Sequence, residues 1–143
     1  MRIRLGLVCL LLTATTASAQ SLEQQAMCAK QAKIAFDNYA ADYSNTGLPK
    51  PVSTDYQSHY NTKLNKCLID VQSTRPMGEE FLTSVVLVDA FERRVYAVYT
   101  RTIARGEGIL PPTKCDLIPT PQTQTHCTSK DEFDAFVAKY MEE

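Results

Sequence analysis

The sequence predicts an α+β fold in which an antiparallel sheet of four or five strands has its inner face covered by an N-terminal and a C-terminal helix, with two disulfides. Helical periodicity occurs near both ends of the chain, whereas segments with strand-like alternation fill the middle. Strands that are grouped together, rather than alternating with helices, are typical of α+β proteins. Four of the five cysteines follow a segment typical of export signals, which favours disulfides.

Residues 1–19 have the features of an export signal. Arg2 and Arg4 give a positive start, residues 5–12 are apolar, and residues 17–19 are the small residues Ala-Ser-Ala. The apolar run is too short to span a membrane, which takes about 20 apolar residues. We therefore expect cleavage after residue 19 and a periplasmic or secreted protein.

Cleavage leaves residues 20–143, a length typical of one α+β domain. The signal holds two of the 15 basic residues and none of the 16 acidic ones, so the mature formal charge is 13 minus 16, or −3. This charge and the lack of a strong Lys/Arg cluster argue against nucleic-acid binding. The mature chain has no second apolar stretch of spanning length, so we expect no membrane span after cleavage.

The mature chain keeps Cys28, Cys67, Cys115 and Cys127, and four cysteines allow three pairings. We favour Cys115–Cys127, because a predicted hairpin brings these two residues together. Cys28 then pairs with Cys67, while the other two pairings stay open. Paired sulfur is neither a nucleophile nor a metal ligand, so this interpretation excludes cysteine chemistry.

Residues 21–44 have the periodicity of a helix, and Ser21 with Gln24 matches a capping box at its start. Residues 45–52 contain a glycine and two prolines and predict a connector. One predicted helix face consists of Leu22, Ala26, Ala29, Phe36, Ala40 and Tyr43. The adjoining stripe consists of Cys28, Ala32, Phe36 and Tyr39. Cys28 should therefore point into or beside the core.

Residues 54–74 change to the period of two that strands show. Apolar and polar residues alternate over 56–61, and residues 67–71 are a second apolar run suited to burial. Residues 62–65 predict a hairpin loop between them, with one bent strand as the competing interpretation. Residues 75–80 contain Pro and Gly and predict a loop.

Residues 81–89 and 95–103 predict the strongest strand pair, since both are rich in β-branched residues. Residues 105–113 contain two glycines and two prolines and predict an exposed loop. Binding residues often lie on loops held by a rigid sheet, which makes this loop the first functional candidate. The alternative is a plain connector.

The last third of the chain predicts a hairpin and then a helix. Residues 114–118 and 125–128 flank a proline-rich turn. Ser129 and Glu132 match an S-x-x-E capping box that starts the final helix. The apolar face of this helix consists of Phe133, Phe136, Val137, Tyr140 and Met141.

The sequence contains no G-x-S-x-G elbow, glycine-rich phosphate loop or H-E-x-x-H zinc pattern. We expect neither a metal nor a cofactor. Among the histidines, His59 has the more polar neighbours, and alternation places Asp55 on its face of the strand but Ser58 on the opposite face. This placement argues against a Ser-His-Asp unit. A simpler interpretation is that His59 and Asn61 hydrogen-bond to loop backbone.

Acidic residues also bracket the tip of the main predicted hairpin. A hydrolase with paired carboxylates would need two of them close together in a cleft. The candidate binding residues are His59, Asn61, Asp89, Glu92 and Arg105.

Residues 56–67, 88–92 and 132–142 together resemble a group of small exported bacterial proteins of unassigned function. The resemblance implies a location in the bacterial envelope and supplies no activity or catalytic residue.

We therefore expect a non-enzymatic binding protein, an accessory or inhibitor of an envelope enzyme, that contacts a protein partner through the sheet face or residues 105–113. The alternative is a small secreted hydrolase that uses His59 with Asp55, Asp89 or Glu92. A third class, a small-ligand carrier, requires a cavity between helices and sheet. The sequence makes no prediction of the oligomeric state.

Overall fold

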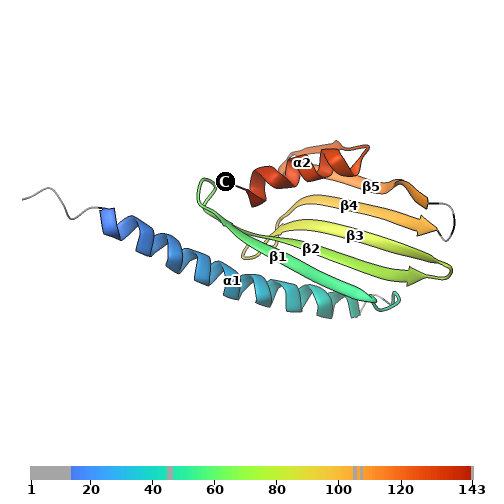
Figure 1. The fold of residues 1–143 in the computed structure, drawn as a ribbon, viewed down its shortest axis with the longest axis horizontal. Helices are drawn as coiled ribbons and strands as arrows, with labels where there is room; N and C mark the ends of the chain where they lie inside the picture. The colour runs from blue at the N-terminus through green and yellow to red at the C-terminus, as the bar shows by residue number, and fades with distance from the viewer. Residues whose placement is uncertain (1–13, 45–46, 105, 107, 143) are drawn as a thin grey trace, which may run out of the picture.

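A computed structural model describes residues 14–44, 47–104, 106 and 108–142, and it shows one antiparallel sheet with a helix at each end of the chain (Figure 1). The elements are α1 (Ala14–Ser44), β1 (Ser53–Asn61), β2 (Lys66–Met77), β3 (Glu80–Asp89), β4 (Val95–Ala104), β5 (Gly108–Thr120), β6 (Thr123–His126) and α2 (Lys130–Met141). The strands follow one another in the sheet in chain order, β1 to β6. The α+β class is confirmed, but the sheet has six strands rather than four or five.

The strand count differs because residues 54–74 form a hairpin and not one bent strand. Asn61 pairs with Lys66 across the β1–β2 turn, and Asn65 adopts a φ of 52° there. A positive φ is tolerated by Asn better than by most residues, which allows the chain to reverse. The short β6 then adds the sixth strand.

Two predicted loops are largely strand. β2 continues to Met77 and β3 begins at Glu80, so only a tight turn at Gly78 remains of the predicted loop 75–80. β5 begins at Gly108 and takes up most of the predicted loop 105–113. Register shifts interrupt the pairing of β5 with β4 near Pro112, as expected where proline cannot donate to a strand ladder.

The two helices lie on opposite sides of the sheet, which corrects the expectation that both cover one inner face. Side chains alternate along β2: Cys67 and Ile69 pack with α1, whereas Leu68 between them packs with α2. We call these two sides the α1 face and the α2 face. Figure 1 shows α1 running beside β1 and β2 and extending past the end of the sheet, with α2 on the other side near β5.

The α2 face holds the larger apolar core. Phe133 of α2 is fully buried and lies 5.4 Å from Tyr99 of β4, centroid to centroid. Ser129 is confirmed as the N-cap, because its side chain accepts a hydrogen bond from the Glu132 N–H at 3.2 Å. The Glu132 carboxylate reaches back one residue further than in a capping box and accepts from the Thr128 N–H at 2.7 Å. The Cys115–Cys127 disulfide lies in the same core, as predicted.

The α1 face is held by the Cys28–Cys67 disulfide, which confirms the second predicted pairing. The buried side of α1 is the stripe that contains Cys28 and Ala32, with exposed fractions of 2% and 0%. The other predicted face is wrong: Leu22 is 67% exposed. Ser21 lies inside the helix and is therefore not its N-cap in the full chain.

Candidate functional site

Three turns lie together at one end of the sheet, which we call the turn end. These are residues 62–65 between β1 and β2, residues 90–94 between β3 and β4, and residues 121–122 between β5 and β6. The Cys28–Cys67 disulfide joins α1 to the same end of β2. A backbone hydrogen bond joins the second turn to the start of β2, since the Ala90 N–H donates to the Cys67 carbonyl at 2.8 Å.

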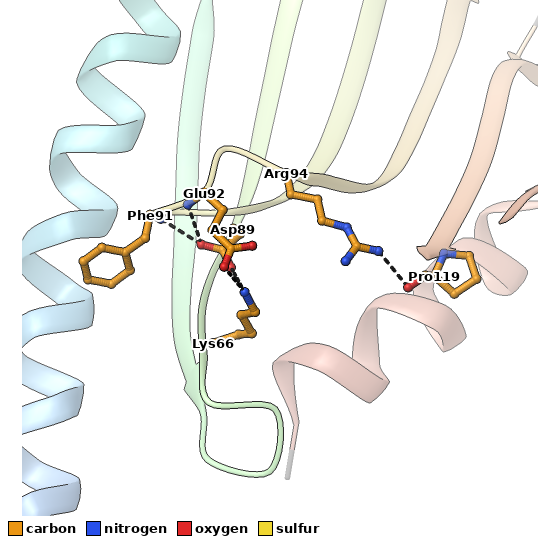
Figure 2. Close-up of polar contacts among 6 residues, drawn as sticks. All are labelled: Lys66, Asp89, Phe91, Glu92, Arg94 and Pro119. Carbon is orange, nitrogen blue, oxygen red and sulfur yellow. Dashed lines mark hydrogen bonds and ion pairs between the residues drawn. The ribbon is translucent and has the colours of Figure 1, made fainter. Parts of the chain in front are cut away.

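Asp89 holds the second of these turns in shape (Figure 2). Its carboxylate is 1% exposed, and Oδ1 accepts hydrogen bonds from the N–H groups of Phe91 at 2.8 Å and Glu92 at 2.9 Å. Its Oδ2 lies 3.3 Å from Nζ of Lys66. An aspartate that bonds the backbone two and three residues ahead is a common way of closing a turn. Asp89 is therefore a structural carboxylate.

Lys66 connects the two turns through charge. Its ammonium pairs with Glu92 as well as with Asp89. The pKa of Lys66 is raised, chiefly by the hydrogen bond to Glu92 and in part by Asp89, against a smaller lowering by burial. The group of one cation and two anions has a net charge of −1.

Arg94 leaves the same turn in the opposite direction, toward β5 (Figure 2). Its Nη2 donates to the Pro119 carbonyl at 2.9 Å, and its guanidinium lies 4.4 Å from the centroid of the Tyr96 ring. The hydrogen bond joins the β3–β4 turn to the end of β5. The cation–π contact adds further attraction.

A hollow of about 260 Å³ lies between α1 and the two turns. Its walls include Met27, Tyr60 and Phe91, with the Lys66–Glu92 pair at its polar side. Phe91 points toward α1 (Figure 2) and is 59% exposed. Met27 of α1 is 53% exposed. Large apolar side chains this exposed, grouped around a concavity, are typical of a protein-binding surface.

The structure brings three of the predicted site residues to the turn end: Asn61, Asp89 and Glu92. Asn61 is 2% exposed; its Nδ2 donates to the Tyr140 carbonyl at 3.0 Å, and its Oδ1 accepts from the Leu64 N–H at 2.9 Å. The interpretation that Asn61 fixes the hairpin through backbone is confirmed.

His59 lies two residues before Asn61 in β1, opposite Leu68 and half-buried on the α2 face. Asp55 shares that face, but four residues of strand separate the two by roughly 13 Å. A hydrogen bond between the side chains of His59 and Asp55 is therefore excluded. The oxygens of Asp89 are occupied by the turn and by Lys66.

Arg105 lies outside the residues that the structure describes. Its neighbour Ala104 ends β4 at the opposite end of the sheet from the turn end.

Sequence reasoning did not find Lys66, Phe91, Arg94 and Met27. A signal for Phe91 existed, because an aromatic residue between Asp89 and two arginines at a hairpin tip has no strand in which to be buried. No local pattern indicated Met27, which reaches the hollow only because the disulfide places α1 there.

Within the described ranges, no three His, Cys, Asp or Glu side chains gather closely enough to hold a metal ion. None of the helices in that part of the chain is long and apolar enough to cross a membrane. The fold and its two disulfides define a disulfide-containing α+β protein. Comparison of the chain with protein families, curated proteins and solved structures returns no match.

Proposed function

We propose that this chain is an exported, non-enzymatic binding protein of the bacterial envelope, an accessory or inhibitor of a protein partner, and that the turn end is its binding surface. The observation that carries the proposal is the hollow beside α1, where exposed Phe91 and Met27 stand around the Lys66–Glu92 pair.

The arrangement suits binding because its parts are held before a partner arrives. A disulfide, the Asp89 turn and the Arg94–Pro119 bond hold the walls in place. A rigid surface loses less conformational entropy on association than a flexible one. Aromatic side chains at the centre of such a surface commonly contribute most of the binding free energy.

The hydrolase alternative has less support from the geometry. A general base needs an orienting group and a substrate within hydrogen-bond reach. Asp55 is too far along β1 to orient His59, and Asp89 is engaged by the turn. An exported disulfide-containing chain, by contrast, meets envelope proteins directly.

The test compares Phe91→Ala with Phe81→Ala. Phe81 is also exposed, at 42%, but lies at the start of β3, at the other end of the sheet. Mature protein immobilised on beads is exposed to envelope extract, and the recovered partner is purified and titrated against each variant. We expect Phe91→Ala to weaken binding about 30-fold or more, as for a central hot spot, and Phe81→Ala to leave binding unchanged.

Equal binding by both variants would reject the turn end as the surface. Recovery of no saturable partner, together with hydrolysis of a model substrate that His59→Ala abolishes, would replace the proposal with the hydrolase.

A further inference from the structure

We propose that the groove between α1 and the open part of the α1 face binds an amphipathic helix of a partner protein. We call it the α1 groove: its floor is Val86, Val88 and Val95, its wall is Ala35 and Asn38 of α1, and Asp42 and Arg93 stand at its ends. The proposal does not depend on the turn end being a binding surface.

The floor of the groove is an apolar part of the sheet that α1 leaves open. α1 packs chiefly on β1 and β2, where Ile69 and Val71 are fully buried. The next strands on the same face carry Val86 and its cross-strand partner Val98, which are only half-buried. Burying these valines would be favourable, by about 25 cal/mol for each Å² removed from water.

The open strip has the width of one helix. Strands lie about 4.8 Å apart, so β3 and β4, which carry the valines, present an apolar strip about 10 Å wide. The strip ends at β5, where Asp116 lies opposite Val98. An α-helix with its side chains is about 10–12 Å across, and packed helices lie 8–10 Å apart. The groove itself encloses about 190 Å³. A helix laid beside α1 would therefore cover the floor.

The flank of α1 above the floor adds apolar contacts. Gln31 marks this flank, since its Nε2 donates to the Ala90 carbonyl of the β3–β4 turn at 3.0 Å. Met27 and Ile34 lie four residues before and three after it, which places them on the same flank. Both are about half exposed, at 53% and 44%. A helix in the groove would cover them together with the valines.

The ends of the groove carry opposite charges, which selects the partner's charge pattern. Arg93 is exposed in the β3–β4 turn; Asp89 also lines that end, but it is buried and its charge is offset by Lys66. Asp42 is exposed in the last part of α1. A helix with acidic residues in its first turn and basic residues in its last turn would match both, if it ran parallel to α1. The same distribution is favoured by the helix macrodipole.

A second copy of this chain is a poorer occupant. The side of α1 that faces away from the sheet is charged, and Lys33 and Asp37 form an exposed ion pair there at 2.8 Å. Laying that side on the valines of another molecule would bury charges without new partners, which is costly. An apolar helix face from a different protein avoids this cost.

The experiment uses two fluorescent amphipathic peptides of about 14 residues, which as helices are about 21 Å long. Both have leucines spaced three and four apart; one has Glu in its first turn and Lys in its last, and its twin has these charges exchanged. Fluorescence anisotropy measures their binding to the mature protein and to the double variant Asp42→Lys/Arg93→Glu. The matched control exchanges the outer pair, as Lys33→Asp/Asp37→Lys.

We expect the wild-type protein to bind the first peptide at least about fivefold more tightly than its twin. The peptide ends attract Arg93 and Asp42 in the first case and repel them in the second. The double variant should reverse this preference, whereas the control should keep it. Comparing variants with the same two peptides removes any difference in peptide helicity. Circular dichroism and melting of each variant establish that it folds.

Lack of saturable binding by either peptide would overturn the proposal. A preference that stays the same in the double variant would overturn it too. Sedimentation that shows a dimer broken by Val88→Lys would instead assign the groove to a second copy.

Discussion

Asn61 connects three parts of the molecule through one buried amide. Its Oδ1 accepts a hydrogen bond from the Leu64 N–H and closes the β1–β2 turn. Its Nδ2 donates to the Tyr140 carbonyl at the end of α2. Removing the amide would leave the Leu64 N–H and the Tyr140 carbonyl, both part-buried, without these hydrogen bonds. The turn end therefore depends on this residue for its stability rather than for recognition.

We expect Asn61→Ala to lower the free energy of unfolding by about 1–3 kcal/mol, since two part-buried hydrogen bonds are lost. Urea denaturation followed by circular dichroism measures the change. Lys63→Ala in the same turn is the control, because Lys63 is exposed and should change stability by less than about 0.5 kcal/mol. Equal effects of the two substitutions would contradict the structural role.

Asp70 and Asp116 are two carboxylates with opposite pKa shifts. Burial raises the pKa of Asp70 above its ordinary 3.8, with Asp134 adding to the rise and Gln72 and Lys130 opposing it. Burial would also raise the pKa of Asp116, but hydrogen bonds from His126 and Gln124 and the charge of Lys114 together lower it. His126 Nδ1 lies 2.7 Å from Asp116 Oδ1.

These shifts predict opposite effects of neutral substitutions. The folded state holds the Asp70 proton more tightly than the unfolded state, so stability from this group falls as pH rises from 3.8 through the raised pKa. Asp70→Asn should therefore be more stable than the wild type at pH 7, with the gain gone below that window. Asp116→Asn should be less stable at pH 7, and this loss should disappear as pH falls through the lowered pKa. Thermal melting across the pH range measures both stability changes. If both variants were more stable than the wild type at pH 7, or both less stable, the directions of the two pKa shifts would be contradicted.

At the scale of elements, α1 depends on its disulfide more than α2 does. α2 carries its own N-cap and buries Phe133 in the larger core. α1 contributes only Cys28 and Ala32 to the fully buried core of the α1 face, and its Ala35, Phe36 and Tyr39 are half-buried. The Cys28–Cys67 bond also keeps the wall of the turn-end hollow in place.

Removing each disulfide in turn, as paired Cys→Ala variants, tests this difference. The Cys28–Cys67 link spans 39 residues and the Cys115–Cys127 link spans 12. Loop-closure entropy predicts losses of about 4 and about 3 kcal/mol, respectively. We further expect hydrogen exchange to show α1 losing protection in the first variant while α2 keeps it. Retained protection of α1 would show that its apolar stripe is enough to hold the helix on the sheet without the disulfide.

At the scale of the whole molecule, the export that we propose would determine which chemistry the cysteines have. In the full chain α1 begins at Ala14 and passes the expected cleavage point without a break. Cleavage after residue 19 would shorten this helix from its start and leave Cys28 and the buried stripe intact. An oxidising compartment then allows both disulfides to form.

We expect mass spectrometry of protein secreted by a bacterial host to show a chain that begins at Gln20. Alkylation without reduction should modify none of its cysteines, since all four remaining ones are paired. An intact Met1 or four modified thiols would contradict the export hypothesis and return cysteine chemistry to consideration. A variant with Ala17→Leu and Ala19→Leu, which lacks small residues before the cleavage point, should stay uncleaved.

Local patterns were sufficient for most of the elements. Period-two alternation placed β1 and the β3–β4 pair, and the S-x-x-E box placed the start of α2. They failed at the predicted loops 75–80 and 105–113, where strand pairing extends through residues that usually end strands. Pairing supplies hydrogen bonds that a composition signal does not contain.

The candidate site was predictable only where its residues lie close together in the sequence. Asp89 and Glu92 carry a turn signal within six residues of sequence, whereas Met27 and Phe91 meet only after 64 residues of chain have folded. Two adjoining stripes of α1 were both apolar, so its own periodicity could not decide which one is buried.

The α+β class, the strand pair of residues 81–89 and 95–103, and the start of the final helix could be predicted from the sequence, because each depends on residues close together in the chain. The sequence also favoured Cys115–Cys127, whose partners lie 12 residues apart, whereas Cys28–Cys67, at 39 residues, followed only by elimination. That the helices lie on opposite faces of the sheet became apparent from the folded structure alone. That choice depends on which side of the strands each helix meets, and in β2 both sides are apolar near Cys67, Leu68 and Ile69. The turn-end hollow and the α1 groove both follow from it.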